Sequence, residues 1–370
     1  MAKAVEEDVT KAVKNRQLAV FFLATVLLIL RVLVFFATKE TLPVGKRIRI
    51  TQTVLSEPIR YDTAQYLKIK GLKTYLPLYP EIHYGDKVVV EGIVQEDKLT
   101  TPKLVDLVIS KNFLFTTRQK IIEFYKSALP EPHASLVAGV TLGSKSGIPE
   151  GFWENLKSSG TAHVVVASGM NVTLVAAFVI SFLVTFVSRK KAVYIACIFI
   201  WLYVFVSGLD APLVRAGIMG TLGFAAIGLG RLNEAKNALF IAAYAMLLIN
   251  PAWVTDLGFI LSFVATLSLI LFGTKIDRYL YFVPGFLREG LSTSLAAQVG
   301  VAPILYATFG QFNLLSPVIN GLVLWLIGPL TVIGMLAGLI GLVLPFLGKL
   351  ILYLVYPLSW WFMWVVNLFG

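Results

Sequence analysis

The chain has 370 residues, of which 57% are hydrophobic and 14% charged, and its formal net charge is +11. Soluble globular proteins carry about 25% charged residues, so the composition excludes a wholly water-soluble protein and predicts that most of the chain lies in lipid. The net charge does not by itself indicate nucleic-acid binding, because the predicted soluble part, residues 39–112, holds 12 Lys and Arg against 9 Asp and Glu. The single cysteine, Cys197, excludes an intrachain disulfide.

The first apolar run covers residues 17–37 and follows a polar segment over residues 1–16. A cleaved signal peptide has an apolar core of about 7–15 residues, and this run is longer and lacks a clear A-x-A cleavage site. We therefore expect an uncleaved anchor in a first segment that ends at residue 43. Arg31 lies near the outer end of this anchor, where its long side chain can reach the polar interface.

Residues 44–112 have a different character. Short runs rich in β-branched residues are separated by turn formers such as Gly71 and Tyr84-Gly85-Asp86. Roughly five short strands in about 70 residues are typical of a small barrel, and the pattern predicts an all-β domain with an OB-like fold. The clearest of the expected strands cover residues 46–55, 64–70, 86–94 and 103–110.

The rest of the chain predicts helices. Residues 113–160 contain short apolar runs mixed with charge, which we interpret as interfacial helices. From residue 161 onward, eight further apolar runs follow, and with the anchor they give about nine spans. We therefore expect a polytopic α-helical membrane protein that carries one extracytoplasmic β-domain. The runs cover residues 164–187, 192–208, 212–230, 237–250, 257–273, 291–309, 317–343 and 350–369.

Charges in the short loops predict the orientation. Cytoplasmic loops accumulate Lys and Arg, and the loops at 209–211, 250–256 and 310–316 contain none. The amino terminus is then cytoplasmic, whereas the β-domain and the carboxyl terminus lie outside. The nine basic residues on the predicted inner side are Arg189, Lys190, Lys191, Arg231, Lys236, Lys275, Arg278, Arg288 and Lys349.

A few polar residues lie close to the apolar runs, near their predicted outer ends. These are His163, Asp210, Arg215 and Asp256. A charge at mid-span costs about 2.5–3.5 kcal/mol on insertion scales, so such residues point to a functional site. The alternative is that all four are ordinary interfacial residues.

The segment Ser168-Gly169-Met170-Asn171 predicts an interrupted helix, because Ser, Gly and Asn together weaken helix within an apolar run. Irregular backbone at membrane depth is tolerated only inside protein or beside a watery cavity. A helix that restarts near Asn171 would direct its first N–H groups outward, where they attract anions such as phosphate. The alternative is a simple glycine kink.

Several catalytic patterns are absent from the sequence. Residues 139–146 resemble a phosphate-binding loop, but Ser144 replaces the second glycine of that motif. The three histidines have no metal-site spacing, and Ser168 lacks the flanking glycines of a nucleophile elbow. We therefore predict no catalytic residue, no metal site and no cofactor, and expect that the chain is not an enzyme.

The β-domain contains five tyrosines, and three lysines lie among them. OB folds bind single strands by stacking bases on aromatic side chains within a basic groove, which makes Tyr66, Lys68, Lys70 and Lys73 candidate contacts for single-stranded DNA. Tyrosines are also common in strands for packing reasons alone, and this structural interpretation remains open.

Four ordered motifs resemble those of the ComEC-type competence proteins, bacterial inner-membrane channels that admit one DNA strand during natural transformation. The run Gly160–Val172 is similar to the family pattern G-T-A-H-L-L-A-I-S-G-L-H-V, although Asn171 replaces its second histidine. Residues 211–219 are similar to P-x-x-x-R-A-x-x-M. Residues 250–263 are similar to N-P followed by D-x-G-F-Q-L-S-F, with Ile260 in place of the Gln. Residues 316–320 are similar to S-P-x-x-N.

The resemblance implies a passive channel domain over residues 161–370, located in the inner membrane. Many members carry a metallo-β-lactamase-like domain after the helices, so this sequence resembles either a short natural member or a truncated one. The expected partners are single-stranded DNA, membrane lipid, a cytoplasmic helicase-like ATPase, a single-strand-binding protein and a separate nuclease. Asp256 is expected to pair with Arg215 or with a helix terminus. The predicted DNA path contains His163, Ser168, Gly169, Asn171, Arg215, Asp256 and Asn320.

A different class of function fits the same sequence. A transporter or flippase for a lipid-linked or small anionic substrate would also need a cation and a broken helix near the outer surface, with the β-domain as a scaffold. A membrane-embedded transferase that uses His163 is disfavoured, because no carboxylate lies at a suitable spacing from that histidine.

Overall fold

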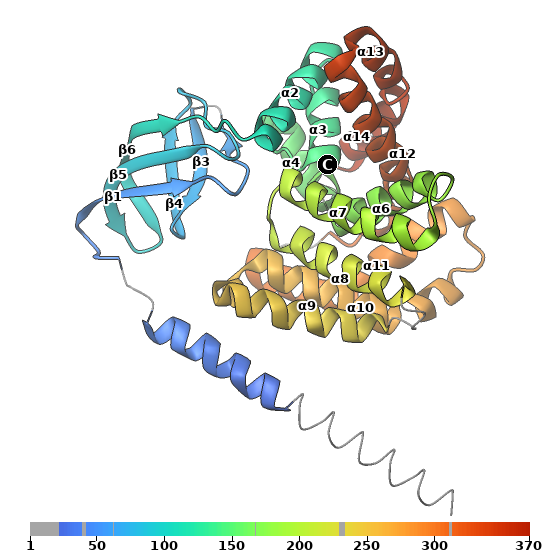
Figure 1. Cartoon of the computed structure of the whole chain (residues 1–370), viewed down its shortest axis with the longest axis horizontal. Coiled ribbons are helices and arrows are strands. Elements are labelled where there is room, and N and C mark those ends of the chain that lie inside the picture. Colours follow the sequence, from blue (N-terminus) through green and yellow to red (C-terminus); the bar gives the residue numbers. More distant parts are fainter. Residues whose placement is uncertain (1–21, 39–41, 62, 167, 229–233, 311–312) are drawn as a thin grey trace, which may run out of the picture.

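The computed structural model of the chain describes residues 22–38, 42–61, 63–166, 168–228, 234–310 and 313–370. The polar segment 1–16, the first residues of the predicted anchor and the predicted inner-loop residue Arg231 lie outside this described part. Figure 1 shows an isolated helix, a β-sheet domain and a body of helices. The isolated helix covers Phe22–Thr38 and has no buried residue, as expected for an apolar helix surrounded by lipid.

The β-domain is a single sheet of six strands in the order β1-β5-β6-β4-β3-β2. All neighbouring strands are antiparallel except β4 and β6, which pair in parallel over two residues. The sequence predicted roughly five strands and named four of them by residue, and the two that it did not name are β2 and β4. The strands are β1 (Arg47–Thr53), β2 (Ile59–Arg60), β3 (Ala64–Ile69), β4 (Leu72–Pro77), β5 (Lys87–Gln95) and β6 (Lys98–Val108).

The strict alternation of buried and more exposed side chains explains why these residues form strands. Along β5 every second side chain is buried, and the same pattern runs along β4. Because side chains of a strand point alternately to opposite faces, one face packs into a core that includes Val88, Val90 and Leu76. The opposite face of β3 and β4 stays polar and aromatic. The OB-like fold remains a prediction.

Helices form the rest of the described chain. Their bounds are α2 (Phe113–Ala128), α3 (His133–Leu142), α4 (Glu150–Ser158), α5 (Ala162–Val165), α6 (Gly169–Leu183), α7 (Arg189–Ser207), α8 (Ala211–Gly228), α9 (Ala235–Ile249), the 3₁₀ turn η1 (Pro251–Thr255), α10 (Leu257–Tyr279), α11 (Gly285–Phe309), α12 (Ser316–Val343), α13 (Pro345–Tyr353) and α14 (Tyr356–Phe369).

The helical body has two hydrophobic cores. One is built from α2 to α5 and α12 to α14, and the other from α6 to α10. The segment 113–160, predicted as interfacial helices, packs into the first of these cores. All ten residues of α3 are buried, because this helix lies between α2, α12 and α14 rather than along an outer surface.

The predicted apolar runs all fall on helices in the described residues, although the number of spans is not settled by length. Five helical segments are long and apolar enough to cross a bilayer, and one of them is Ala162–Leu183, which counts α5 and α6 together. The number is six if α13 and α14, which meet at a 46° bend, form one span. Shorter apolar helices cover Phe22–Thr38, Ala211–Ala226 and Ala235–Ile249. Nine spans therefore stays a prediction.

Five helices of the body contact one another in a closed ring. α6 packs against α8, α8 against α10, α10 against α11, and α11 against α12, which returns to α6. In the apolar stretches of α10 and α11, 17% of the residues are buried, compared with 44% in α12. A helix with one sealed apolar stripe of about 100° would bury more than a quarter of its residues. The sides of α10 and α11 are thus only loosely covered.

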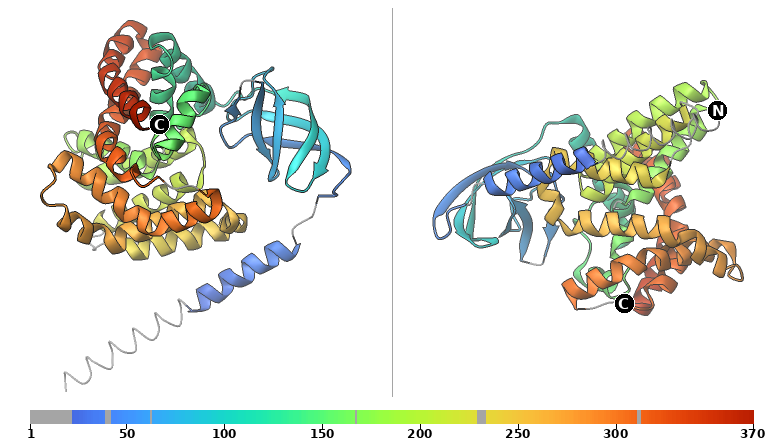
Figure 2. Two further views of the ribbon diagram at one scale, coloured as in Figure 1. Left: turned by 180° about the vertical axis from the view of Figure 1, so that it is seen from behind. Right: turned by 90° about the horizontal axis from the view of Figure 1, so that it is seen from below.

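A buried ion pair joins the β-domain to the helical body. Glu57, in the loop between β1 and β2, lies 2.8 Å from Arg118 of α2, and both side chains are less than 10% exposed. The other carboxylate oxygen of Glu57 accepts a hydrogen bond from Ser144. Tyr84 lies under the Arg118 guanidinium and donates its hydroxyl to the Phe205 carbonyl of α7. Figure 2 shows the β-domain beside the body in two further views.

Candidate functional site

The predicted interruption of the helix is confirmed. α5 ends at Val165 and α6 begins at Gly169, and Val166 and Ser168 both have extended backbone angles. Ser168 makes no side-chain cap hydrogen bond to the first turn of α6. The helix restarts at Gly169, two residues before the expected position, Asn171. The start of α6 thus presents backbone N–H groups that Ser168 does not cap.

Arg215 of α8 lies at this helix start. A Cβ atom added to Gly169 would be 2.8 Å from Arg215 Nη2, so only glycine fits without displacing the guanidinium. Nη1 donates to the Ser262 carbonyl and to the Thr266 hydroxyl, both on α10. Nε is buried without a hydrogen-bond partner among the described residues. The cation therefore has only neutral partners, at the helix end where the macrodipole favours an anion.

The four sequence motifs meet around this break. Gly160 has a left-handed backbone with φ of 74°, and a Cβ there would approach the Ser316 hydroxyl oxygen to 2.5 Å. Gly258 lies against Pro212, at 4.0 Å between that proline and the position of an added Cβ. Together with the Gly169–Arg215 contact, these approaches connect segments that are up to 156 positions apart in sequence, from Gly160 to Ser316.

Asp256 was expected to pair either with Arg215 or with a helix terminus, and it pairs with a helix terminus. Its carboxylate caps α10 by accepting a hydrogen bond from the Phe259 N–H at 2.9 Å. Asn250 caps η1 in the same way, through the Ala252 N–H. The described residues contain no ion pair between Asp256 and Arg215. The Asn-Pro and Asp-x-Gly-Phe pattern thus builds two consecutive helix starts beside α8.

Two predicted path residues are fully buried in this structure. Asn171 has no exposed surface and donates its amide to the Val140 carbonyl of α3 at 2.8 Å. Asn320 is 1% exposed and donates to the hydroxyls of Ser294 and Ser316. Both amides connect neighbouring helices, and neither presents a free surface to a ligand.

The other predicted residues at the break are accessible. His163 of α5 has an exposed side chain. Ser168, Gly169, Arg215 and Asp256 are each half-buried.

The candidate contacts on the β-domain share one face of the β3–β4 hairpin. Tyr66 pairs across the strands with Tyr75, and Lys68 with Lys73. The rings of Tyr66 and Tyr75 are 5.2 Å apart, and Tyr61 lies 6.4 Å from Tyr75. We call Tyr61, Tyr66 and Tyr75 the tyrosine face.

Charges around the tyrosine face are modest. Partial burial raises the pKa of the Tyr66 hydroxyl, so this side chain is neutral at physiological pH. Lys73 donates to Asp97 at 2.7 Å, and this hydrogen bond raises the pKa of the lysine. Lys68 is exposed. Lys70 is exposed at the turn between the strands, where its own N–H is bonded to Gln52.

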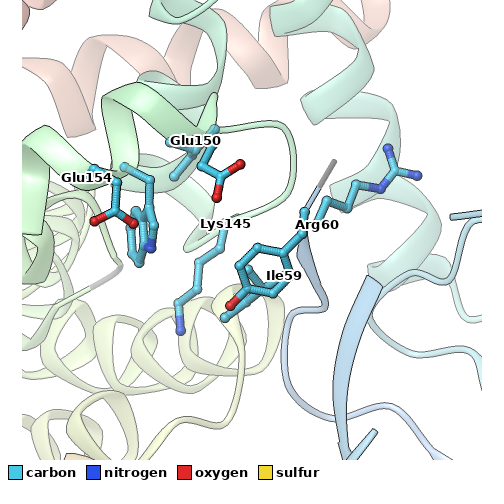
Figure 3. Close-up of a pocket in the computed structure, with 8 residues that line it drawn as sticks. Ile59, Arg60, Lys145, Glu150 and Glu154 are labelled. Atoms are coloured by element: carbon cyan, nitrogen blue, oxygen red, sulfur yellow. The ribbon is translucent and has the colours of Figure 1, made fainter. Parts of the chain in front are cut away.

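The tyrosine face approaches the helical body at a narrow crevice. Figure 3 shows Ile59 and Arg60 on the β-domain side, and Lys145, Glu150 and Glu154 on the other side. Arg60 is paired with Glu81 of its own domain at 2.7 Å. The crevice has a cavity volume of about 20 Å³, which is enough for about one water molecule. The two parts of the chain are therefore closely apposed here.

Sequence reasoning missed several polar residues of this region. Thr266 and Ser294 touch Arg215 and Asn320, respectively, but neither belongs to a motif. Their only sequence signal is a hydroxyl inside an apolar helix, which is common and unspecific. Among the described residues no group of three or more potential metal ligands occurs.

The fold and the site define a helical membrane protein with a β-sheet domain and a broken helix that faces an unpaired arginine. The profile of a family described as Competence protein matches residues 140–370. The chain therefore belongs to the Competence protein family, and the family predicted from the motifs is confirmed.

The chain is also similar to the ComE operon protein 3 of Bacillus subtilis (strain 168). The two are 27% identical over 208 residues, which make up 56% of this chain and 26% of that protein. The chain thus spans about a quarter of the length of this curated relative. No solved structure matches the chain.

Proposed function

We propose that this protein takes part in DNA uptake during natural transformation, as an inner-membrane passage for single-stranded DNA. Family membership supports a role in competence. The observation that carries the proposal is Arg215, a half-buried cation with only neutral partners at the start of α6. A phosphate of the DNA backbone would supply the negative charge that both the guanidinium and the helix terminus favour.

The surroundings of Arg215 suit a DNA strand that moves through the protein and is not retained there. Affinity for nucleic acid rises with each phosphate that a protein neutralises, and a densely cationic passage would retain its cargo. Arg215 interacts with hydroxyl and carbonyl oxygens of α10, so its immediate surroundings are polar. In this proposal the phosphates cross largely hydrated.

The β-domain guides the strand toward the membrane in this proposal. Its OB-like fold and extracytoplasmic position are part of the proposal, as are nine spans and a cytoplasmic amino terminus. The tyrosine face offers stacking surfaces, and Lys68 and Lys70 lie at its edge. The driving force comes from a cytoplasmic helicase-like ATPase and a single-strand-binding protein, and a separate nuclease removes the other strand. The chain itself has no enzymatic role in this scheme.

A matched pair of cations tests the proposal. Arg215→Gln removes the charge at the broken helix, and we expect uptake of labelled DNA to fall about tenfold or more, as the loss of a charged hydrogen bond of about 1.5–3 kcal/mol implies. Arg31→Gln removes an exposed cation from the Phe22–Thr38 helix and serves as the control, with uptake unchanged. Equal uptake in all three proteins, at equal membrane levels, would overturn the role of Arg215.

Reconstitution separates this function from its alternative. A transporter or flippase for a small or lipid-linked anion would use the same arginine and helix start. Vesicles that contain the purified protein should admit a single-stranded oligonucleotide when a single-strand-binding protein is enclosed to trap it. Movement of phosphate esters or lipids without the oligonucleotide would favour the alternative.

A further inference from the structure

The connection from β6 to α2 presents three large apolar side chains to its surroundings (Figure 1). Val108, the last residue of β6, is 53% exposed, Ile109 is 67% exposed, and Phe113, the first residue of α2, is 77% exposed. Single apolar residues are common on protein surfaces, but several of them together mark a contact surface. We call Val108, Ile109 and Phe113 the apolar patch.

Hydrogen bonds hold the backbone of this connection in place. Asp86 is 2% exposed and accepts from the N–H groups of His83 and Ser110, both at 2.8 Å. The side chain of Asn112 caps α2 by accepting from the Leu114 N–H at 2.9 Å. The exposure of the apolar patch is therefore built into the fold.

The same region of the β-domain contacts the carboxyl end of α7. The Tyr84 ring meets the Phe115 ring of α2 edge-on, with centroids 5.0 Å apart. The Tyr84 hydroxyl donates to the Phe205 carbonyl at 3.1 Å. Because Phe113 is two residues from Phe115, and Asp86 is two residues from Tyr84, the apolar patch lies beside this end of α7.

The exposed face of α7 ends at the same place. α7 is one of the helices that are long and apolar enough to cross a bilayer. Tyr194, Ile198, Leu202 and Phe205 are between 40% and 70% exposed. Their spacing of three or four residues places them along one side of the helix, where acyl chains cover a membrane-spanning helix. This lipid-facing stripe and the apolar patch therefore meet at one membrane surface.

Two lysines flank the apolar patch. Lys87 pairs directly across the strands with Val108, and Lys111 lies between Ile109 and Phe113 in sequence. Both lysines are exposed, and neither forms an ion pair with another described residue. Asp106, also exposed, is two residues before Val108, so the local balance is two lysines against one aspartate. Apolar side chains with adjacent lysines are typical of a segment that lies in the head-group region of a membrane.

We propose that the apolar patch inserts into the bilayer leaflet at the carboxyl end of α7, with Lys87 and Lys111 on anionic head groups. Lipid is the occupant that the structure favours, because the patch continues the lipid-facing stripe of α7. This contact gives the β-domain a second attachment besides the Glu57–Arg118 pair and limits how it can turn above the helical body. It does not depend on what the protein transports.

Quenching of fluorescence by lipid tests the contact in the full chain. In a Cys197→Ser background, a fluorophore is attached to Ile109→Cys or Phe113→Cys, and the protein is reconstituted into vesicles of phosphatidylcholine and phosphatidylglycerol. Lipids that carry a spin label near the head-group end of the acyl chain should quench both fluorophores severalfold. Lys98→Cys is the control, because this exposed first residue of β6 is about 30 Å along the strand from Val108. Its fluorophore should keep its fluorescence.

Iodide in the water provides the opposite measurement. It should quench the fluorophore at Lys98→Cys and largely spare the other two. Fluorophores at Ile109→Cys and Phe113→Cys that iodide quenches as strongly as the control, and that the spin-labelled lipids leave unchanged, would overturn the proposal. That result would favour a protein partner for the apolar patch.

The lysines are tested by the lipid composition. Quenching of the fluorophore at Phe113→Cys by spin-labelled lipids should increase when phosphatidylglycerol is added to phosphatidylcholine vesicles. Lys87→Gln with Lys111→Gln should lose this increase, whereas Lys98→Gln, which removes an exposed lysine far from the patch, should retain it. The same increase in all three proteins would overturn the role of the two lysines.

Discussion

The buried pair between Glu57 and Arg118 makes a quantitative prediction about how the β-domain is held. The two side chains are 8% and 3% exposed, and their charged atoms are 2.8 Å apart. Arg118→Met would leave the Glu57 carboxylate buried with the Ser144 hydroxyl as its main partner. Glu57→Gln would leave the guanidinium over the Tyr84 ring without its counter-charge.

The expected magnitude follows from the cost of an unpaired charge in a protein interior. Removing one partner of a buried ion pair costs about 3–5 kcal/mol, whereas replacing both partners by apolar residues is often neutral or stabilising. At about 1.4 kcal/mol for each factor of ten, either single variant should shift the balance between docked and undocked β-domain by about 140- to 3700-fold. Glu57→Leu with Arg118→Met should recover most of this loss.

Pulsed EPR on the full chain measures the docking. In a background with Cys197→Ser, spin labels at Tyr79 and Tyr279, which are 76% and 79% exposed, report the distance between the β-domain and the end of α10. The native pair should give one narrow distance distribution, and each single variant a broad one. Lys73→Met breaks an exposed pair of similar length and should have little effect. If Arg118→Met keeps the narrow distribution, the ion pair does not hold the domain.

Two further predictions concern the broken helix and the β-domain. Gly169→Ala should displace the Arg215 guanidinium and reduce DNA uptake, whereas Gly151→Ala, which meets no atom within 4 Å, should not; equal uptake would contradict the close contact. The hydrogen bond from Arg60 lowers the pKa of Glu81 below its ordinary value of 4.5. Its stabilising effect is therefore present above pH 4.5 and is lost as the pH falls through the folded-state pKa. Unfolding measured against pH should show a weaker acid dependence for Glu81→Gln, and identical curves would exclude this contribution.

Hydropathy and alternation predicted the elements better than their arrangement. The apolar runs fall on helices, and the alternating runs fall on β1, β3, β5 and β6. These signals are local, because residues a few positions apart determine the apolar face of a helix or strand. The central place of α3 was missed, since its ten residues look like a short interfacial run and only contacts with distant helices bury them.

In the candidate site, too, features that depend on adjacent residues were predicted, and contacts between distant residues were not. Ser168 and Gly169 predicted the break from their own chemistry. The partners of Arg215 could not be predicted, because Ser262 and Thr266 are 47 and 51 positions away. Ser262 belongs to the third motif but contributes its backbone carbonyl, and Thr266 lies outside the motifs. The direction of the Asn171 side chain was equally hidden, since it depends on where the Val140 carbonyl lies.

The positions of the orphaned polar atoms connect these observations. Among the described residues, seven have a buried side-chain oxygen or nitrogen atom without a hydrogen bond. Two of them, Glu57 and Arg118, form the junction with the β-domain. The others lie on α6, α7, α8 and α12, close to the four motifs: Asn171, Tyr203, Ser207, Arg215 and Asn320.

Stability alone does not account for this concentration of polar groups. Each buried polar group without a partner costs about 1–3 kcal/mol relative to a satisfied one, and apolar residues of similar shape would remove that cost. Other buried polar groups of the first core, such as His133, Thr141 and Ser359, are hydrogen-bonded. In the proposed function, the start of α6 stays open beside Arg215 and the β-domain stays docked to the helical body, and polar groups at these places serve both requirements. We therefore interpret the break between α5 and α6 as a feature whose position is fixed by the contacts of the neighbouring helices.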